Sequence, residues 1–244
     1  MVRSVSTGCR TLDEMLGGGI PLEKITLIYG EPSTGKTTLA LGMAVSFLSG
    51  AIEDSGSSRV LYIDSDRKLS LDRFSQIAGR RADEFLERLI VSMPDNFSEQ
   101  TLLIEQLVSY ISANIDFIVF DTVTSLYQEE VASGGGTFPA SREFNRQLGY
   151  LKEAVEDQHV TVLLLSQVHS SLHSEPPVIT PISTRLLRYW SDTIIQLELT
   201  PQTGVRAGFI EKPRRSLTGC MFKLAPFGIV DMGPAERVQP RKSG

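Results

Sequence analysis

The feature that most constrains this chain is the segment GEPSTGKT at residues 30–37, a complete match to the pattern G-x-x-x-x-G-K-[ST]. The strand-like run KITLIYG (24–30) precedes the segment, and a helix-like stretch from about Lys36 to Ser49 follows it. A strand, a glycine-bearing turn and a helix in this order form a phosphate-binding loop. Because such loops belong to α/β proteins with a parallel sheet, the segment predicts both the fold class and a phosphorylated ligand.

The residues of this loop have separate tasks. Gly30 and Gly35 let the backbone curl around phosphate oxygens, and the exposed amides at the start of the helix favour an anion. Lys36 can reach the outer phosphates and assist catalysis, and the hydroxyl of Thr37 can ligate Mg²⁺. We therefore expect a nucleotide to be bound by Gly30, Glu31, Pro32, Ser33, Thr34, Gly35, Lys36, Thr37 and Thr38.

Strand-like and helix-like segments alternate along the rest of the chain, which predicts a mostly parallel sheet with helices on both faces. The expected strands include 59–64, 115–121 and 160–167, and the expected helices include 70–78, 82–89, 98–113 and 139–158. Ser98 is the expected N-cap of its helix, and Thr11 with Glu14 forms a T-x-x-E capping box in an earlier one.

The C-terminal part changes character. Short strand-like runs joined by turn signals, from DTIIQLEL (192–199) to GIVDM (228–232), predict antiparallel strands that extend one edge of the sheet. The resulting organisation is a single domain over residues 1–233. Residues 234–244 are expected to be a disordered tail.

The composition excludes some classes of protein. With a net charge of −5, the chain is not a basic nucleic-acid binder overall, although a local basic patch is compatible with this charge. No apolar run approaches the roughly 20 residues of a membrane helix, and the N-terminus lacks an apolar signal-peptide core. Cys9 and Cys220 form no spacing pattern, so we expect reduced thiols in a cytoplasmic protein.

Polar residues end three of the predicted strands. Asp121 ends IVFD and Gln167 ends VLLLSQ, both at the sheet edge where α/β proteins place ligands. Asp121 is the expected second Mg²⁺ ligand beside Thr37, and Gln167 could sense a terminal phosphate. In LYIDSDRKL (61–69), Asp64 and Asp66 are two residues apart, so continued strand geometry would put both carboxylates on one side.

Several stretches together resemble the RecA-type recombinase ATPases. They are STGCRTLDEMLGGGI (6–20), GEPSTGKTTLA (30–40), LYID (61–64), IVFD (118–121) and LLLSQVH (163–169). The resemblance runs from Ser6 to about Asp231 and is strongest to short archaeal paralogues of the RadA recombinase, which lack its N-terminal helical domain. KaiC-like ATPases share the opening TGCRTLDEMLGGG, so that stretch alone does not discriminate between the two groups.

The resemblance implies a P-loop ATPase with ATP and Mg²⁺ as cofactors. It gives Asp66 the role of polarising the attacking water, Arg73 that of stacking on adenine, and Gln167 that of coupling ATP to DNA. The recombinases have Glu where this chain has Asp66. The shorter side chain sets the carboxylate back by about 1.5 Å, and a misplacement of that order can cost about 100-fold in rate. We therefore expect weak ATPase activity with near-normal ATP binding.

The resemblance also implies that the loops at about 124–139 and 169–184 face single-stranded DNA. Tyr127 could stack on a base, although packing against the domain is an equally good explanation of this residue. The basic cluster near residue 212 could instead reach the nucleotide of a neighbouring subunit. The candidate DNA contacts are Tyr127, Arg142, Arg146, His169, Arg185, Arg188, Lys212, Arg214, Arg215, Arg241 and Lys242.

Three functions are compatible with these residues. The favoured one is an ATP-binding, DNA-binding accessory protein of homologous recombination and DNA repair that modulates the main recombinase. The alternatives are a KaiC-like regulatory or signalling ATPase without a DNA role and a nucleotide-gated interaction protein. Expected partners are single-stranded or recombination-intermediate DNA, a RadA-type recombinase and a Holliday junction resolvase, with a homodimer left open. We expect no membrane association and no strand exchange by this chain alone.

Overall fold

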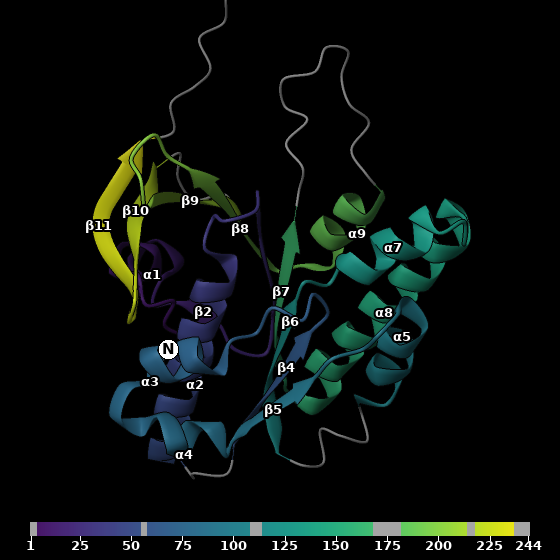
Figure 1. The fold of residues 1–244 in the computed structure, drawn as a ribbon, viewed down its shortest axis with the longest axis horizontal. Coiled ribbons are helices and arrows are strands. Elements are labelled where there is room, and N and C mark those ends of the chain that lie inside the picture. The colour runs from purple at the N-terminus through teal and green to yellow at the C-terminus, as the bar shows by residue number, and fades with distance from the viewer. Residues whose placement is uncertain (1–3, 55–57, 108–113, 168–181, 214–217, 237–244) are drawn as a thin grey trace, which may run out of the picture.

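A nine-stranded sheet runs through the molecule in the order β11-β10-β9-β8-β3-β7-β6-β4-β5 (Figure 1). From β8 to β5 all neighbouring strands are parallel, and β9, β10 and β11 continue the sheet as antiparallel strands. The strands are β3 (Ile25–Gly30), β4 (Arg59–Asp64), β5 (Leu89–Ser92), β6 (Ile115–Asp121), β7 (Thr161–Gln167), β8 (Thr193–Leu199), β9 (Val205–Lys212), β10 (Thr218–Ala225) and β11 (Gly228–Glu236). This computed structural model describes residues 4–54, 58–107, 114–167, 182–213 and 218–236.

Helices cover both faces of the sheet (Figure 1). On one face lie α1 (Arg10–Leu16), α2 (Lys36–Asp54), α3 (Leu71–Ala78) and α4 (Ala82–Leu86), with the 3-10 turn η1 (Gly79–Arg81) and a small sheet of β1 (Ser4–Val5) and β2 (Ile20–Pro21). On the other lie α5 (Phe97–Glu105), α7 (Ser125–Ala132), α8 (Thr137–Gln158) and α9 (Ile182–Trp190). The mostly parallel sheet with antiparallel C-terminal strands confirms the predicted fold class.

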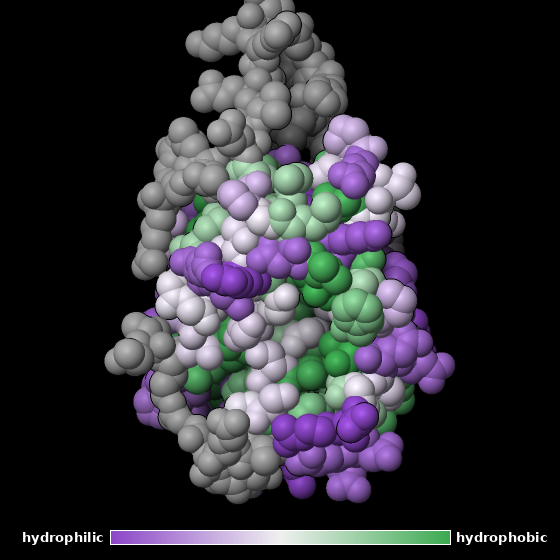
Figure 2. All heavy atoms as spheres, turned by 90° about the vertical axis from the view of Figure 1, so that its left-hand side faces the viewer, coloured by the Kyte–Doolittle hydropathy of each residue, from purple (hydrophilic) through white to green (hydrophobic). Residues whose placement is uncertain are grey.

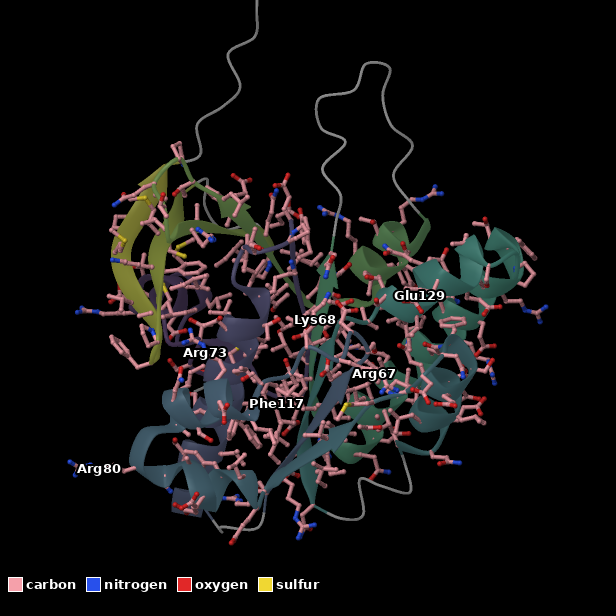
Figure 3. All side chains as sticks on the ribbon, in the orientation of Figure 1. Arg67, Lys68, Arg73, Arg80, Phe117 and Glu129 are labelled. Carbon is pink, nitrogen blue, oxygen red and sulfur yellow. The ribbon has the colours of Figure 1, made fainter. Side chains whose placement is uncertain are left out.

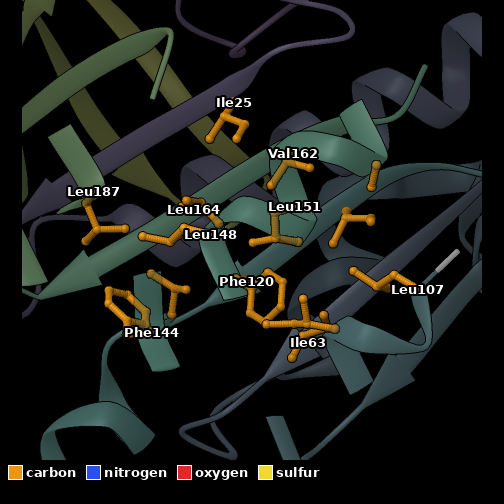
Figure 4. Packing of buried hydrophobic residues seen from close by; sticks show 14 of the residues in the cluster. Ile25, Ile63, Leu107, Phe120, Phe144, Leu148, Leu151, Val162, Leu164 and Leu187 are labelled. Carbon is orange, nitrogen blue, oxygen red and sulfur yellow. The ribbon is translucent and has the colours of Figure 1, made fainter. Parts of the chain in front are cut away.

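The sheet carries one apolar core on each face. The core under α8 brings Phe144, Leu148 and Leu151 against strand residues such as Phe120 and Leu164, and all five are fully buried (Figure 4). These α8 positions repeat every three or four residues, which puts them on one face of the helix. The core on the other face combines residues of α1, α2, α3 and α4 with the opposite side chains of the same strands. Both faces of the strands are buried, as parallel sheets require.

Two predicted helix starts are wrong. α5 begins at Phe97, and its N-cap is Asn96, whose side chain accepts a hydrogen bond from the backbone N–H of Glu99. Ser98 lies inside the helix, and the predicted end of this helix, residues 108–113, is outside the described residues. In α1 the N-cap is Cys9, whose side chain makes no capping hydrogen bond. Thr11 lies inside this helix and donates its N–H and hydroxyl to Asp231 in β11, so it does not form the predicted capping box.

The C-terminal strands reach further than predicted. Pro234, Ala235 and Glu236 pair with β10 as the end of β11, so the expected disordered tail does not begin at residue 234. The outer hairpin exposes some apolar side chains, among them Phe227 in the turn between β10 and β11 and Met232 in β11. On this side of the molecule hydrophobic and hydrophilic residues are intermixed (Figure 2). Among the residues that the structure describes, no helix has both the length and the apolar character needed to cross a bilayer.

Candidate functional site

The phosphate loop lies where the parallel strands end. In register, Gly30 of β3 is opposite Gln167 of β7, and Asp64 of β4 is opposite Asp121 of β6. Because the carboxyl ends of parallel strands meet at one edge of a sheet, these four residues lie around the start of α2. The structure therefore brings together four strand-end positions that are far apart in the sequence.

The loop backbone adopts conformations that suit its glycines. Gly35 has φ of 93°, in the left-handed region, and a Cβ there would lie 2.8 Å from a methyl group of Leu224. At Gly30 a side chain would overlap the carbonyl oxygen of Leu197. The hydroxyl of Thr34 donates to the carbonyl oxygen of Glu31 at 2.9 Å, which closes the turn. Gly30 is therefore required by space and Gly35 by its backbone conformation.

Lys36 is folded onto the loop. Its Nζ donates to the carbonyl oxygens of Gly30 at 2.9 Å and Glu31 at 2.8 Å, and the residue is only 6% exposed. Burial lowers its pKa to about 8, although Asp121 and Asp66 oppose this shift. A bound phosphate would replace the two carbonyl oxygens as acceptors and would restore the stability of the charged form.

Asp121 is the centre of a buried polar group. Its Oδ2 accepts hydrogen bonds from the hydroxyls of Thr37 and Tyr62, each at 2.7 Å. Burial raises the pKa of Asp121, and the two hydroxyl donors partly offset this shift. A hydroxyl and a carboxylate oxygen at this separation are the hard ligands that Mg²⁺ takes when it keeps several waters, so Thr37 and Asp121 fit such an ion.

The two aspartates of LYIDSDRKL have different surroundings, and they do not lie on one strand face. β4 ends at Asp64, whose carboxylate accepts the backbone N–H groups of Lys68 (3.1 Å) and Leu69 (2.7 Å). Asp66 lies in the resulting turn, where its Oδ2 accepts from Lys68 Nζ at 2.9 Å and from Gln167 Nε2 at 3.2 Å. Asp64 therefore shapes the turn, and Asp66 meets Gln167 beside the phosphate loop.

The antiparallel strands form one wall of the site. The guanidinium of Arg73 donates to the carbonyl oxygens of Ala225 (2.6 Å) and Pro226 (2.5 Å), at the turn from β10 to β11. Arg206 of β9 donates its Nε–H to the carbonyl oxygen of Ser33 in the loop at 2.8 Å. This wall places Arg73 near the phosphate loop, while its stacking on adenine stays a prediction.

Tyr62, Lys68 and Arg206 join this site although none of them was predicted as a site residue. Tyr62 is two residues before Asp64 on a strand, so the period of two could have placed its hydroxyl on the same side. The contacts of Lys68 and Arg206 depend on a turn and on a distant strand, for which the sequence contains no comparable signal.

Of the two explanations offered for Tyr127, packing against the domain is confirmed and stacking on a base is wrong. Helix α7 occupies much of the segment expected to be a loop, and Tyr127 is buried in it. The ring packs against Phe97 and Phe144, and the hydroxyl bonds to Ser141 at 2.9 Å. Those apolar neighbours take up the ring face that a base would need. The aromatic side chain that this segment exposes is Phe138, at 79%.

The candidate basic contacts are dispersed and mostly paired. Arg146 bonds to Glu105 at 2.6 Å and to Glu143 at 2.9 Å, and Arg188 pairs with Glu211 at 2.8 Å. Lys212 donates to the carbonyl oxygen of Ser191 at 2.6 Å. Arg142 on α8 and Arg185 on α9 are exposed. The remaining candidates lie outside the described residues: His169, Arg214, Arg215, Arg241 and Lys242.

Comparison with known proteins agrees with this geometry. The Rad51 family matches residues 1–232. The "DNA repair and recombination protein RadB" of Methanococcoides burtonii is 32% identical over 225 residues, which cover 91% of this chain and 96% of that protein. The protein of the same name from Thermococcus kodakarensis is 31% identical over 233 residues, which cover 93% of this chain and 99% of that protein. The chain therefore belongs to the Rad51 family.

Proposed function

We propose that this chain is an ATP-binding, DNA-binding accessory protein of homologous recombination and DNA repair, with slow Mg²⁺-dependent ATP hydrolysis. The observation that carries the proposal is the hydrogen bond between Thr37 and Asp121, which joins the phosphate loop to the strand end opposite it. The names of the RadB relatives, DNA repair and recombination proteins, supply the biological setting. Membership of the Rad51 family favours this function over the KaiC-like alternative.

Each residue of the site would have its own role in ATP binding or hydrolysis. Lys36 would leave the carbonyl oxygens of Gly30 and Glu31 and bind the outer phosphates. Thr37 and Asp121 would hold Mg²⁺, which neutralises charge that develops on the phosphates. Asp66 would orient the attacking water with a carboxylate that is one methylene shorter than the family's Glu, so hydrolysis would be slow. Arg73 would contact the base.

Gln167 supports a link between ATP and DNA. Its side chain donates to Asp66, and its backbone ends β7 directly before residues 168–181. A movement of Asp66 on ATP binding would therefore shift Gln167, which lies directly before the segment that we assign to DNA binding. Arg185 and Arg142, with their exposed guanidinium groups, are the described residues best suited to phosphate contacts.

We assign residues 1–236 to one domain, since β11 completes the sheet. The proposed macromolecular partners are single-stranded or recombination-intermediate DNA and a RadA-type recombinase. A Holliday junction resolvase and a second copy of the chain are further proposed partners. Each of these would be tested by direct binding of the purified components.

The experiment that tests the function has two independent arms. In the first, ATP binding is titrated for the wild type and for Lys36→Ala, which should lose it. In the second, binding of single-stranded DNA is measured across a salt series with and without ATP. We expect DNA binding that weakens with salt and responds to ATP in the wild type alone. ATP binding without any DNA binding would contradict the recombination role and favour a KaiC-like regulator.

A further inference from the structure

Lys68 is held beside the site by its own turn. The backbone N–H of Lys68 donates to Asp64 Oδ1, and the preceding residue, Arg67, has φ of 54°, in the left-handed region. This turn directs the ammonium of Lys68 to Asp66 Oδ2 at 2.9 Å. Lys68 lies over the strand ends near the centre of the sheet, whereas Arg67 points toward α5 and α8 (Figure 3).

Arg67 therefore serves a different purpose from its neighbour. Its guanidinium pairs with Asp95, away from the phosphate loop. Two consecutive cations thus have separate partners, one on each side of the turn. This contrast makes Arg67 a control of the same charge, at the adjacent position, for any test of Lys68.

The charges around Lys68 are those of a phosphate site. Lys68 is linked to the phosphate loop by two contacts: its Nζ bonds to Asp66 Oδ2, and the same oxygen accepts from Gln167, which is opposite Gly30 in the sheet. The hydrogen bond with Asp66 raises the pKa of Lys68, so its side chain is charged at neutral pH. The two ammonium groups, of Lys36 and Lys68, can attract the phosphates of ATP. The two carboxylates, of Asp66 and Asp121, can attract Mg²⁺.

We propose that Lys68 is a second phosphate-binding cation, which leaves Asp66 and binds the terminal phosphate when ATP occupies the site. The inference rests on the proposed ATP binding and assigns to this turn the recognition of ATP over ADP. The phosphate loop would hold the phosphates that ATP and ADP share and Lys36 would bind the outer ones, whereas Lys68 would contact only the terminal phosphate, which ADP lacks.

The ion pair with Asp66 is suited to such an exchange. The Lys68 side chain is 68% exposed and that of Asp66 is 8% exposed, so the lysine can move into solvent while the carboxylate stays in place. A terminal phosphate carries more charge than one carboxylate, so it would compete well for the ammonium. Departure of Lys68 would also free a lone pair of Asp66 Oδ2 for the attacking water. Gln167 would remain bonded to the same oxygen.

The test compares affinities for two nucleotides. ADP and a non-hydrolysable ATP analogue are titrated, each with Mg²⁺, into the wild type, Lys68→Met, Lys68→Arg and the control Arg67→Met. For Lys68→Met we expect about tenfold weaker binding of the ATP analogue and less than about twofold change for ADP, as for loss of one charged hydrogen bond. Lys68→Arg should keep most of the preference, and Arg67→Met should change neither affinity.

Other outcomes have distinct meanings. Equal losses for both nucleotides in Lys68→Met, or no loss for either, would overturn the inference. An equal loss of preference in Arg67→Met would do the same, because the effect would then be one of general charge. A wild type that binds neither nucleotide would instead refute the proposed function. Because Lys68 is exposed, its variants should melt at the wild-type temperature.

Discussion

The nucleotide site and the surface of α8 and α9 use their charged residues in different ways. At the strand ends, Lys36, Asp121 and Asp66 come from separate elements and meet around one point. On α8, by contrast, Arg146 pairs with Glu143 one turn away and with Glu105 of α5. The first arrangement leaves a buried lysine with a lowered pKa, which a phosphate would relieve. The second is satisfied without any ligand, so counting arginines does not identify a binding face.

The largest effect should follow from removing the charge at the phosphate loop. We expect Lys36→Ala to weaken ATP binding by about 100-fold or more, because the lysine would supply charged hydrogen bonds to the phosphates. Titration of ATP with Mg²⁺ measures the loss, and circular dichroism checks the fold. Binding within about threefold of the wild type would show that the site does not work as a phosphate loop.

The next effect concerns the two aspartates. Asp66→Glu should raise the rate of ATP hydrolysis by about tenfold or more, since the longer side chain restores the reach of the carboxylate. The matched control is Asp64→Glu, which lengthens a carboxylate that already binds the N–H groups of Lys68 and Leu69. It should slow hydrolysis by disturbing the turn. If Asp66→Glu is no faster than the wild type, reach is not what limits turnover.

A third effect is the pH dependence of ATP affinity. The pKa of Lys36 is lowered to about 8 by burial, and a bound phosphate would raise it. Below that pH the ammonium is already present, and above it ATP binding must be accompanied by proton uptake. Affinity should therefore fall by up to about tenfold per pH unit above 8. Calorimetry in buffers of different ionisation enthalpy measures the uptake; Lys36→Arg should remove it, and a flat wild-type profile would contradict the assignment.

The smallest effects are expected on the helical surface, and they test directly whether paired and unpaired arginines differ. Arg185→Ala should weaken binding of single-stranded DNA by a few-fold and reduce its salt slope by about 0.7, the value for one phosphate contact. Arg146→Ala should change binding by less than about twofold, because its donors are already used by Glu105 and Glu143. Equal losses in both variants would show that ion pairing within the protein does not disable an arginine for DNA.

The sequence was most informative where a function needs adjacent residues. The phosphate loop requires a strand, a fixed set of residues and a helix in immediate succession, so its position between a strand and a helix could be predicted. Asp121 could be assigned because a polar residue that ends an apolar strand must lie at the sheet edge. The antiparallel direction of the C-terminal strands also followed from local turn signals.

Two of the wrong predictions depend on partners far along the chain. Thr11 has the spacing of a capping box, but Asp231, 220 residues later, accepts its hydrogen bonds instead. Tyr127 is buried because α5 and α8 bring Phe97 and Phe144 against its ring. Asp66 leaves the strand because the carboxylate of Asp64 bends the following backbone. In the first two cases tertiary contacts outweighed a local pattern, and in the third a local turn ended the strand.

The wall formed by β9 and β10 has a consequence for how the protein becomes active during synthesis. The phosphate loop is translated early, but its supporting contacts come from residues translated much later. Leu224 lies against Gly35, and Arg206 donates to the carbonyl oxygen of Ser33. Arg73 likewise cannot form its hydrogen bonds until Ala225 and Pro226 have been translated. A nascent chain would thus carry the whole nucleotide motif without the support it needs. Nucleotide binding would be acquired abruptly, once the last strands of the sheet have been made.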